Sequence, residues 1–289
     1  MTYNVGGGIP DFDSKSSAIA KVIKEVDPDI LVTQEATEYE DANGVRHRNL
    51  DDIVSDKKPK FREHFYFGPT LSMKEHLHLR KRLFVHAIFK DWQDWKQGNA
   101  ILSRWEFTRL SAPSIPGTPR NIPLYQTPLY RGNRDTDPRY AILARIDKSP
   151  VFPFVVGVHL TTLVDERGQD AIPGKAEEAL KLRSEQTRRL LDLLRENVLE
   201  PKELVFLLGD FNAAASEPCI SSVLEREGGF VRLAPIEELS TIHEVPKPID
   251  HIFVYPENRL VDYHCWIVDS PVAQKASDHL PVVADVNVI

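Results

Sequence analysis

Cysteine is scarce in this sequence, which has only Cys219 and Cys265 among its 289 residues. Two cysteines are too few for a disulfide framework, a four-cysteine zinc site or a cysteine-ligated iron–sulfur cluster, although one disulfide stays open. Long apolar runs are also missing, because no stretch reaches the roughly 18 residues of a membrane-spanning helix. We therefore expect no transmembrane segment and no disulfide-dependent scaffold.

Excess positive charge is absent as well. The chain has 36 Lys and Arg against 43 Asp and Glu, a net charge of −7, which argues against a globally basic nucleic-acid coat protein. Its 42% hydrophobic residues are enough for a large core in a soluble globular protein. The N-terminus has no basic region followed by an apolar run, so no export signal is predicted and the cytoplasm is the default expectation. A strand predicted to start at residue 1 leaves open that further residues precede it.

Apolar periodicity predicts an alternation of helices and strands. Residues 14–26 and 175–198 carry apolar stripes at helical spacing, and a shorter helix is expected at 217–227. Strands are expected at 1–5, 30–32, 61–68, 83–90, 98–104, 140–146, 151–160, 204–208, 249–255, 260–268 and 282–288. Because no repeat or linker is visible, we expect a single domain over residues 1–289, with mixed sheets covered by a few helices.

The segment 106–139 contains six prolines and is expected to be a long loop. A loop of this length is usually functional or mobile. Arg139 stands at its end, directly before a predicted strand, and we expect it to contact a phosphate group of a substrate.

Polar side chains stand at the ends of several predicted strands, where a rigid sheet presents catalytic groups. A carboxylate inside an apolar strand, as in Ile-Asp-His-Ile at 249–252, needs a titrating partner or a cation, because a lone buried charge is costly. Each such residue by itself also fits a turn, a cap or a surface position, but their recurrence favours a shared site. The residues are Asn4, Glu35, His159, Asp210, Asn212, Asp250, Asp278 and His279.

The motifs that contain these residues follow a recognisable order. They are Thr-Tyr-Asn at 2–4, Gln-Glu at 34–35, Gly-Asn-Ala-Ile-Leu-Ser-Arg at 98–104, Val-His-Leu at 158–160, Gly-Asp-Phe-Asn-Ala at 209–213, Ile-Asp-His-Ile at 249–252 and Ser-Asp-His-Leu-Pro-Val at 277–282. Together they resemble the endonuclease/exonuclease/phosphatase (DNase I-like) superfamily over residues 2–282. The resemblance implies an α/β (α+β) fold, a four-layer α/β sandwich with two central mixed β-sheets flanked by helices. It also implies metal-dependent hydrolysis of phosphate esters.

The resemblance implies Mg²⁺ as the cofactor, with Mn²⁺ as a substitute. Glu35 would be the first metal ligand, with Asp278 as a second acid near the metal and Asn4 beside them. Hard oxygen donors of this kind suit Mg²⁺. A zinc enzyme is a weaker alternative, because carboxylates outnumber histidines in this set.

The resemblance also implies catalytic roles. His279 would be a general acid or base, with Asp250 fixing its tautomer. Asp210 would orient or deprotonate the attacking water, and the choice of base between Asp210 and His279 stays open. His159 would donate to the phosphoryl oxygens. Two further assignments are Asn212, which would hold a phosphate oxygen, and Asn99, whose motif matches the family and which would either bind the substrate or be structural.

Two departures bear on the substrate. Nucleases of the abasic-site and tyrosyl-DNA types have an acid two residues after the asparagine of the first strand, where this chain has Gly6. The abasic-site group also has Tyr in place of His159, and many relatives with Val-His-Leu have Asn in place of Gly157. These differences lower the expectation of a repair endonuclease.

Residues 57–90 contain nine Lys and Arg against two Glu, which predicts either a track for a polyanion such as nucleic acid or a solvated basic face. The leading prediction for the whole chain is a Mg²⁺-dependent phosphodiesterase that acts on nucleic acid, a nucleotide or a lipid head group. The alternatives are a phosphomonoesterase and an inactive scaffold that binds polyanions or proteins. The sequence does not predict the oligomeric state.

Overall fold

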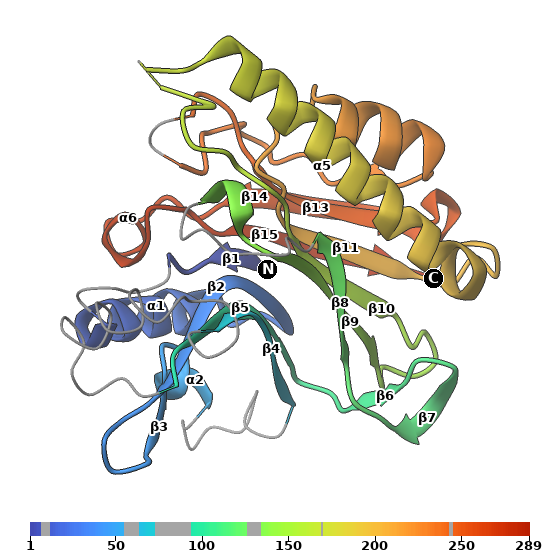
Figure 1. The fold of residues 1–289 in the computed structure, drawn as a ribbon. Helices are drawn as coiled ribbons and strands as arrows, with labels where there is room; N and C mark the ends of the chain where they lie inside the picture. The colour runs from blue at the N-terminus through green and yellow to red at the C-terminus, as the bar shows by residue number, and fades with distance from the viewer. Residues whose placement is uncertain (7–11, 55–63, 73–93, 126–133, 169, 243–244) are drawn as a thin grey trace.

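The computed structural model describes residues 1–6, 12–54, 64–72, 94–125, 134–168, 170–242 and 245–289. Within these ranges the strands form two mixed sheets, and helices cover the outer faces (Figure 1). The predicted strand at 83–90 and most of the basic segment 57–90 lie outside the described residues. In the described part of the chain, no helix has both the length and the apolar character needed to cross a membrane.

The first sheet has the N-terminal strand near its centre. Strand β1 (Thr2–Asn4) pairs in parallel with β2 (Ile30–Glu40) and antiparallel with β15 (Val282–Val288), so segments from both ends of the sequence meet here. The order within the described residues is β14 (Leu260–Ile267), β15, β1, β2, β5 (Lys96–Ser103) and β4 (Phe65–Ser72), with β3 (Arg46–Arg48) paired to β2. This pairing brings Asn4 next to the residues at the middle of β2.

The second sheet contains the most apolar strands of the chain. Its central pair, β10 (Phe154–His159) and β11 (Val205–Asp210), is parallel, and their neighbours are antiparallel to them. The order within the described residues is β12 (Val231–Arg232), β13 (Asp250–Tyr255), β11, β10, β9 (Arg139–Ile146), β6 (Phe107–Arg109) and β7 (Ala112–Pro116), with β8 (Arg120–Tyr125) paired to β9.

Three apolar clusters hold the layers together. Helix α1 (Phe12–Val26) buries one face against the first sheet, next to α2 (Asp51–Val54) and α6 (Ala273–Ala276). Helix α5 (Pro173–Leu194), its continuation η2 (Arg195–Leu199) and helix η3 (Cys219–Glu227) cover the second sheet. The third cluster lies between the sheets. The predicted sandwich of two sheets flanked by helices is confirmed, and Figure 1 shows α1 and α5 on different sides of the sheets.

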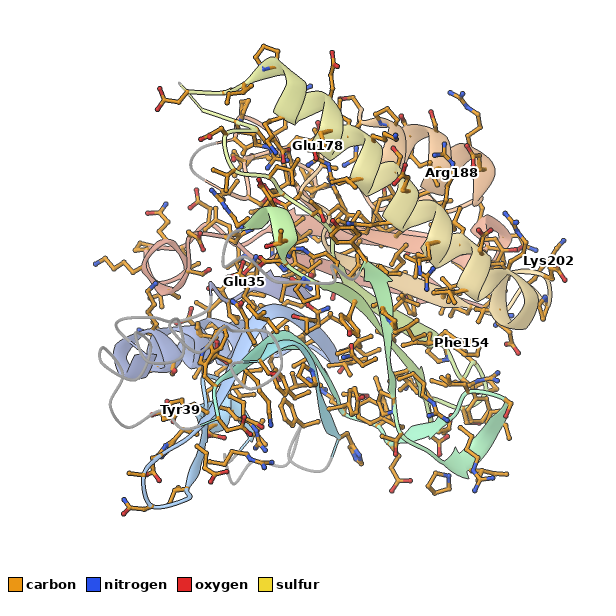
Figure 2. The ribbon with its side chains drawn as sticks, viewed as in Figure 1. Glu35, Tyr39, Phe154, Glu178, Arg188 and Lys202 are labelled. Atoms are coloured by element: carbon orange, nitrogen blue, oxygen red, sulfur yellow. The ribbon has the colours of Figure 1, made fainter. Side chains whose placement is uncertain are left out.

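Helix α5 is amphipathic. Its inner side buries Ala179, Leu190 and Leu194, whereas Glu178 and Arg188 are exposed on its outer side (Figure 2). Pro173 starts the helix at a position where its missing N–H and fixed φ are tolerated. This outer side therefore offers charged positions that are remote from the sheets.

The two sheets approach most closely near Gly157 of β10. A Cβ atom at this position would lie 2.4 Å from Cγ1 of Val32 in β2, far inside van der Waals contact. A side chain as large as Asn cannot occupy position 157 without moving the sheets apart. The departure from relatives with Asn here therefore follows from how tightly this pair of sheets packs.

The prediction of a long loop at 106–139 is wrong for much of the part of this segment that the structure describes. Residues 107–125 form β6, β7 and β8, and Arg134–Thr136 form the short helix η1. Pro113 and Pro116 lie in β7 and Pro123 lies in β8, strands at the margin of the second sheet, where a missing ladder N–H is tolerated. The proline content is therefore typical of edge strands here.

Strand β13 presents two neighbouring polar side chains to opposite faces. Asp250 faces the site described below, whereas His251 is 2% exposed and packs against Phe211 and Phe253 in the outer layer. Nε2 of His251 donates a hydrogen bond to the Ala213 carbonyl oxygen, 2.8 Å away. Burial lowers the pKa of His251 from 6.5 to about 4.

We expect His251 to make the free energy of unfolding depend on pH. Because its pKa is lower in the folded than in the unfolded chain, its contribution is fully present above pH 6.5 and is lost as the pH falls toward 4. The contribution is on the order of 3 kcal/mol. In urea unfolding at pH 7 and pH 4.5, His251→Gln should lose less stability between the two pH values than the wild type. His264→Gln, on the exposed strand β14, should behave like the wild type, and identical pH slopes for His251→Gln and wild type would contradict the prediction.

Candidate active site

Three neighbouring strands bring His159, Asp210 and Asp250 together. His159 ends β10 and pairs in register with Asp210 at the end of β11, which in turn pairs with Asp250 at the start of β13. Asp278 and His279 arrive from the segment before β15, and Asn4 arrives from the end of β1. The sandwich thus gathers the predicted residues at one end of both sheets.

Glu35 reaches this end through an irregularity in β2. The register of β2 against β5 shifts between Thr33 and Ala36, and Glu35 has a φ of 55°, in the left-handed region. A bulge of this kind redirects one side chain out of the strand alternation and is common next to active sites. The bulge turns Glu35 toward the cavity, and Figure 2 shows the residue near the centre of the molecule.

Two amide groups hold the Glu35 carboxylate. Asn4 Nδ2 donates to Oε1 at 3.3 Å, and Gln97 Nε2 donates to Oε2 at 3.2 Å. Burial raises the pKa of Glu35, and the charge of Asp278 raises it further. The Asn4 amide oxygen accepts from the Gly6 N–H at 2.9 Å, so Asn4 turns its NH₂ group toward the carboxylates.

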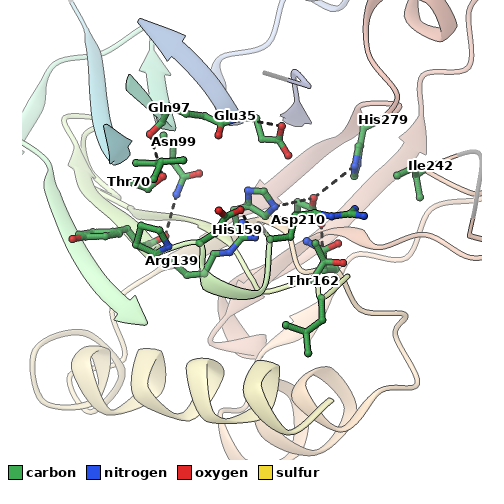
Figure 3. A pocket seen from close by; sticks show the side chains of 18 of the residues that line it. Glu35, Thr70, Gln97, Asn99, Arg139, His159, Thr162, Asp210, Ile242 and His279 are labelled. Atoms are coloured by element: carbon green, nitrogen blue, oxygen red, sulfur yellow. Dashed lines mark hydrogen bonds and ion pairs between the residues drawn. The ribbon is translucent and has the colours of Figure 1, made fainter. Parts of the chain in front are cut away.

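Asp210 lies between the two histidines (Figure 3). Its Oδ2 is 3.5 Å from His159 Nε2 and 3.7 Å from His279 Nε2, and it accepts a hydrogen bond from Asn4 Nδ2 at 3.0 Å. Burial, followed by the charge of Asp250, raises the pKa of Asp210 to about 6. Asp210 can therefore gain and lose a proton near neutral pH.

His279 and Asp250 form a buried hydrogen-bonded pair. His279 Nδ1 lies 2.9 Å from Asp250 Oδ2, which leaves Nε2 directed toward Asp210. Burial alone would lower the pKa of His279, but the charges of Asp250 and Asp210 outweigh it and raise the pKa to about 10. Within the described residues the second oxygen of Asp250 has no hydrogen-bond partner, so the pairing with His279 is the main interaction of this carboxylate.

His159 has the opposite electrostatic environment. Burial lowers its pKa well below the usual 6.5, and the positive charge of Arg139 lowers it further. His159 is therefore a neutral imidazole at pH 7, with one N–H to donate.

Asn212 is placed by a tight turn after β11. It has a φ of 49°, its backbone N–H donates to Asp210 Oδ1 at 2.8 Å, and its Nδ2 donates to the Leu160 carbonyl oxygen at 3.0 Å. One amide hydrogen of Asn212 is thus used within the protein. The side chain also lines the cavity, where a second amide hydrogen is available to a ligand.

The loops after β10 and β11 are tied to α5 by a buried arginine. Arg183 Nη1 contacts Glu166 Oε1 at 2.6 Å, and its Nη2 contacts Glu217 Oε2 at 2.8 Å. Arg167, next to Glu166, donates to the carbonyl oxygen of Asn212. This network orders the rim of the site, because breaking a buried ion pair leaves an uncompensated charge.

The two predicted substrate-binding residues lie on the side of the cavity opposite Ile242 (Figure 3). Asn99 is buried, and its Nδ2 donates to the Tyr140 carbonyl oxygen at 3.0 Å, which links the two sheets. Arg139 is 5% exposed and pairs with Asp137 at 3.4 Å. Asn99 therefore has a structural contact as well as a place in the cavity wall.

The missing acid at position 6 has a steric reason. A Cβ atom at Gly6, whose φ is 59°, would lie 2.9 Å from Oδ1 of Asp278. Asp278 occupies the space into which a side chain at position 6 would point, and it is the second acid near Glu35 in this protein.

Two groups of side chains can be considered as metal ligands. Asp210, Asp250 and His279 offer donor atoms within 4.8 Å of one another, but the short His279–Asp250 contact uses one ring nitrogen and one carboxylate oxygen. Glu35 and Asp278 are carboxylates near each other, and the charge of Asp278 raises the pKa of Glu35. A divalent cation would relieve this repulsion, and the oxygen donors match those that Mg²⁺ prefers. The Glu35–Asp278 pair therefore fits a metal ion.

Sequence reasoning missed Gln97, Arg167 and Arg134, which also line the cavity. Gln97 directly precedes the Gly-Asn-Ala-Ile motif, but its role depends on pairing β5 with the bulged strand β2. No pattern along the chain marks this contact. The Gly-Asn-Ala-Ile motif by itself indicates only that positions next to it could belong to the site.

We expect Gln97→Ala to lower the affinity for Mg²⁺ and kcat by roughly 10- to 100-fold, as residues that orient a metal-ligating carboxylate typically do. The loss of one hydrogen bond leaves the Glu35 carboxylate free to rotate. Calorimetric titration with Mg²⁺ and steady-state kinetics measure the two effects. Gln274→Ala, at a surface glutamine that donates to Asp269, is the matched control. Unchanged Mg²⁺ affinity in Gln97→Ala would contradict the prediction.

The cavity that these residues line has a volume of about 300 Å³. Glu35, Asp210, His159 and His279 all line it (Figure 3). Ile242 and Val245 lie on the side of His279, whereas Arg139, Pro138 and Tyr140 belong to another part of the wall. The volume is at the small end of the range for ligand pockets.

Comparisons with known proteins agree with the fold and identify the family. The family model described as "Endonuclease/Exonuclease/phosphatase family" matches residues 1–279. No curated protein matches the chain at a significant level. Similar solved structures include an endonuclease/exonuclease/phosphatase from Beutenbergia cavernae (20% identity, TM-score 0.66, 99% of this chain and 70% of that chain). Others are truncated Caenorhabditis elegans TDP2 (16%, 0.63, 99% and 96%) and an endonuclease/exonuclease/phosphatase from Bacteroides vulgatus (15%, 0.65, 100% and 97%).

Proposed function

Because this chain belongs to the endonuclease/exonuclease/phosphatase family, whose members hydrolyse phosphate esters, we propose that it is a Mg²⁺-dependent phosphodiesterase. The observation that carries the proposal is the hydrogen-bonded His279–Asp250 pair facing Asp210, with Glu35 in the wall of the same cavity. The substrate class is a phosphodiester of nucleic acid, a nucleotide or a lipid head group.

In this proposal Glu35 and Asp278 hold the metal ion, and Asn4 and Gln97 fix the Glu35 carboxylate through their amide groups. When bound, Mg²⁺ neutralises charge on the phosphate oxygens, and Mn²⁺ would supply the same chemistry. The contacts of Asn4 with both Glu35 and Asp210 couple the metal side of the site to the catalytic side.

The two catalytic groups have complementary proton affinities. Asp210, with a pKa raised to about 6, is ionised at pH 7 and can accept the proton of an attacking water. His279, with a pKa raised to about 10, is an imidazolium at the same pH and can stabilise or protonate an oxygen. We therefore assign Asp210 as the base and His279 as the cationic donor, oriented by Asp250.

The remaining residues bind the phosphate ester. His159 is neutral and donates one N–H toward the phosphoryl oxygens as charge develops. Asn212 offers its second amide hydrogen, and Asn99 and Arg139 contact the substrate from the cavity wall. The cavity wall includes Arg139 on one side of Asp210 and Ile242 on the other (Figure 3), and this placement supports a diester with two substituents over a monoester.

The direct test is hydrolysis of bis(p-nitrophenyl) phosphate and p-nitrophenyl phosphate with Mg²⁺, with Mn²⁺ and with EDTA. The proposal expects turnover that requires metal, favours the diester and disappears in Asp210→Ala and His279→Ala. A higher rate with the monoester would identify a phosphomonoesterase instead. If neither ester nor a nucleotide diester is hydrolysed and Mg²⁺ does not bind, the chain is an inactive scaffold.

A further inference from the structure

Besides its acidic residues, the cavity wall contains three arginines. Arg134, Arg139 and Arg167 all line the same cavity as Glu35, Asp210 and His279. Figure 3 shows Arg139 well separated from His279 and from Ile242, whose apolar side chain lies beyond His279. The cavity is therefore asymmetric, with Arg139 in one part of its wall and Ile242 in another.

Arg139 is a buried cation with spare hydrogen-bonding capacity. It is 5% exposed, and within the described residues its Nε atom has no hydrogen-bond partner. Its ion pair with Asp137 is long, at 3.4 Å between Nη2 and Oδ2. A buried guanidinium N–H without a partner is costly, and an anionic ligand in the cavity would satisfy it.

Arg134 and Arg167 stand on two segments that are joined to each other. Arg134 belongs to η1, and the neighbouring Asp135 accepts a hydrogen bond from the Val164 backbone N–H at 2.7 Å. Asp135 also pairs with Lys175 of α5 at 3.3 Å. Arg167 follows Glu166, which the buried Arg183 holds. The two arginines therefore lie on a rim that is ordered before any ligand binds.

The acids near these arginines do not use all of their hydrogen-bond donors. Asp137 pairs with Arg139 through Nη2 at 3.4 Å, the exposed Asp165 also lines the cavity, and each guanidinium group carries five N–H donors. Glu166 contacts Arg167 at 3.1 Å, but it is shared with Arg183. Arginine binds phosphate in a bidentate geometry that one carboxylate does not exhaust.

We propose that Arg134, Arg139 and Arg167 form a subsite for a second phosphate group of the substrate, next to the phosphate that is cleaved. The inference rests on the proposed function, because the subsite belongs to the same cavity as the catalytic residues. The preferred substrate then carries at least two phosphate groups, as in a nucleotide bisphosphate, a nucleic-acid strand or a phosphorylated inositol.

The test measures binding to the full chain in EDTA, so that neither turnover nor a metal ion contributes. Thymidine 3′,5′-bisphosphate is compared with thymidine 5′-monophosphate, and inositol 1,4-bisphosphate with inositol 1-phosphate, by calorimetry. The proposal expects at least one bisphosphate to bind about tenfold tighter or more than its monophosphate, as expected for added charge-assisted hydrogen bonds. The pair with the larger preference identifies a nucleotide or an inositol source.

The variants Arg134→Gln and Arg167→Gln should each bring the ratio of the two affinities closer to one, and Arg167→Lys should retain part of it. Arg188→Gln, on the exposed outer side of α5, is the matched control and should keep the full preference (Figure 2). Equal affinity of bisphosphate and monophosphate in the wild type, or a preference that both glutamine variants retain, would overturn the inference. If the bisphosphate binds tighter but no ester is hydrolysed, the proposed function is refuted and the subsite is retained. If esters are hydrolysed but the bisphosphate does not bind tighter, the subsite is refuted and the proposed function is retained.

Discussion

Replacement of Asp210 by Asn is expected to lower kcat for metal-dependent diester hydrolysis by about 10³-fold or more, the upper part of the range for a general base. Asn keeps the size of the side chain, but its amide cannot take a proton from water. The carboxylate also lies 3.5 Å and 3.7 Å from His159 and His279, so its charge supports both neighbours. Steady-state kinetics at saturating Mg²⁺ measures the effect.

The pH profile adds a second readout for Asp210. Because the pKa of Asp210 is raised to about 6, its carboxyl group becomes ionised as the pH rises through 6 in the metal-free site. A bound cation lowers this pKa, so the acidic limb of the pH–activity profile moves to lower pH. The wild type should therefore lose activity on acidification, whereas the residual rate of Asp210→Asn should lack that limb. Asp192→Asn, at an exposed acid of α5, is the control. A kcat for Asp210→Asn within tenfold of wild type, with its fold intact by circular dichroism, would remove Asp210 from the mechanism.

Replacement of Glu35 by Gln is expected to abolish both activity and the stabilisation of the protein by Mg²⁺. A ligand at free concentration L that binds only the folded state stabilises it by RT ln(1 + L/Kd), so Mg²⁺ should raise Tm in the wild type and leave the Tm of Glu35→Gln unchanged. The control is Glu178→Gln, on the outer side of α5, which should keep the full Mg²⁺ response (Figure 2).

The same variant should also change the pH dependence of stability when metal is removed. Burial and Asp278 raise the pKa of Glu35 above 4.5, so the folded state holds this proton more tightly than the unfolded state. In EDTA, the contribution of Glu35 should therefore be lost as the pH rises above 4.5, and the stability of the wild type relative to Glu35→Gln should fall over this range. An equal Mg²⁺-induced rise in Tm for the wild type and Glu35→Gln would show that the metal is held elsewhere, for which Asp210, Asp250 and His279 are the candidates.

The two histidines that the sequence singled out were recognisable for a local reason. His159 and His279 flank apolar strands, and such strands are buried wherever the chain takes them. A polar group at the end of a buried strand lies at the rim of the sheet. The same reasoning identified Asp210 and Asp250, which the structure pairs in register on neighbouring strands.

The bulge at Glu35 could not be predicted from local sequence patterns. Its position depends on the register of β2 against β5, residues separated by more than sixty positions in the chain. The same pairing places Gln97 against the carboxylate. Likewise, the proline-rich segment 106–139 could not be recognised as edge strands, because an edge is defined by what does not pair with it.

The sequence by itself thus determined which polar residues stand at the ends of buried strands, because strand length, apolar burial and polar strand ends are encoded within ten or so consecutive residues. Only the tertiary structure decided how those residues are held and what surrounds them. Gln97 beside Glu35, Asp278 in the space above Gly6 and the three arginines of the cavity wall come from segments far apart in the chain. Their contacts arise from the packing of two sheets against each other, and this packing depends on the whole core, which no local pattern encodes.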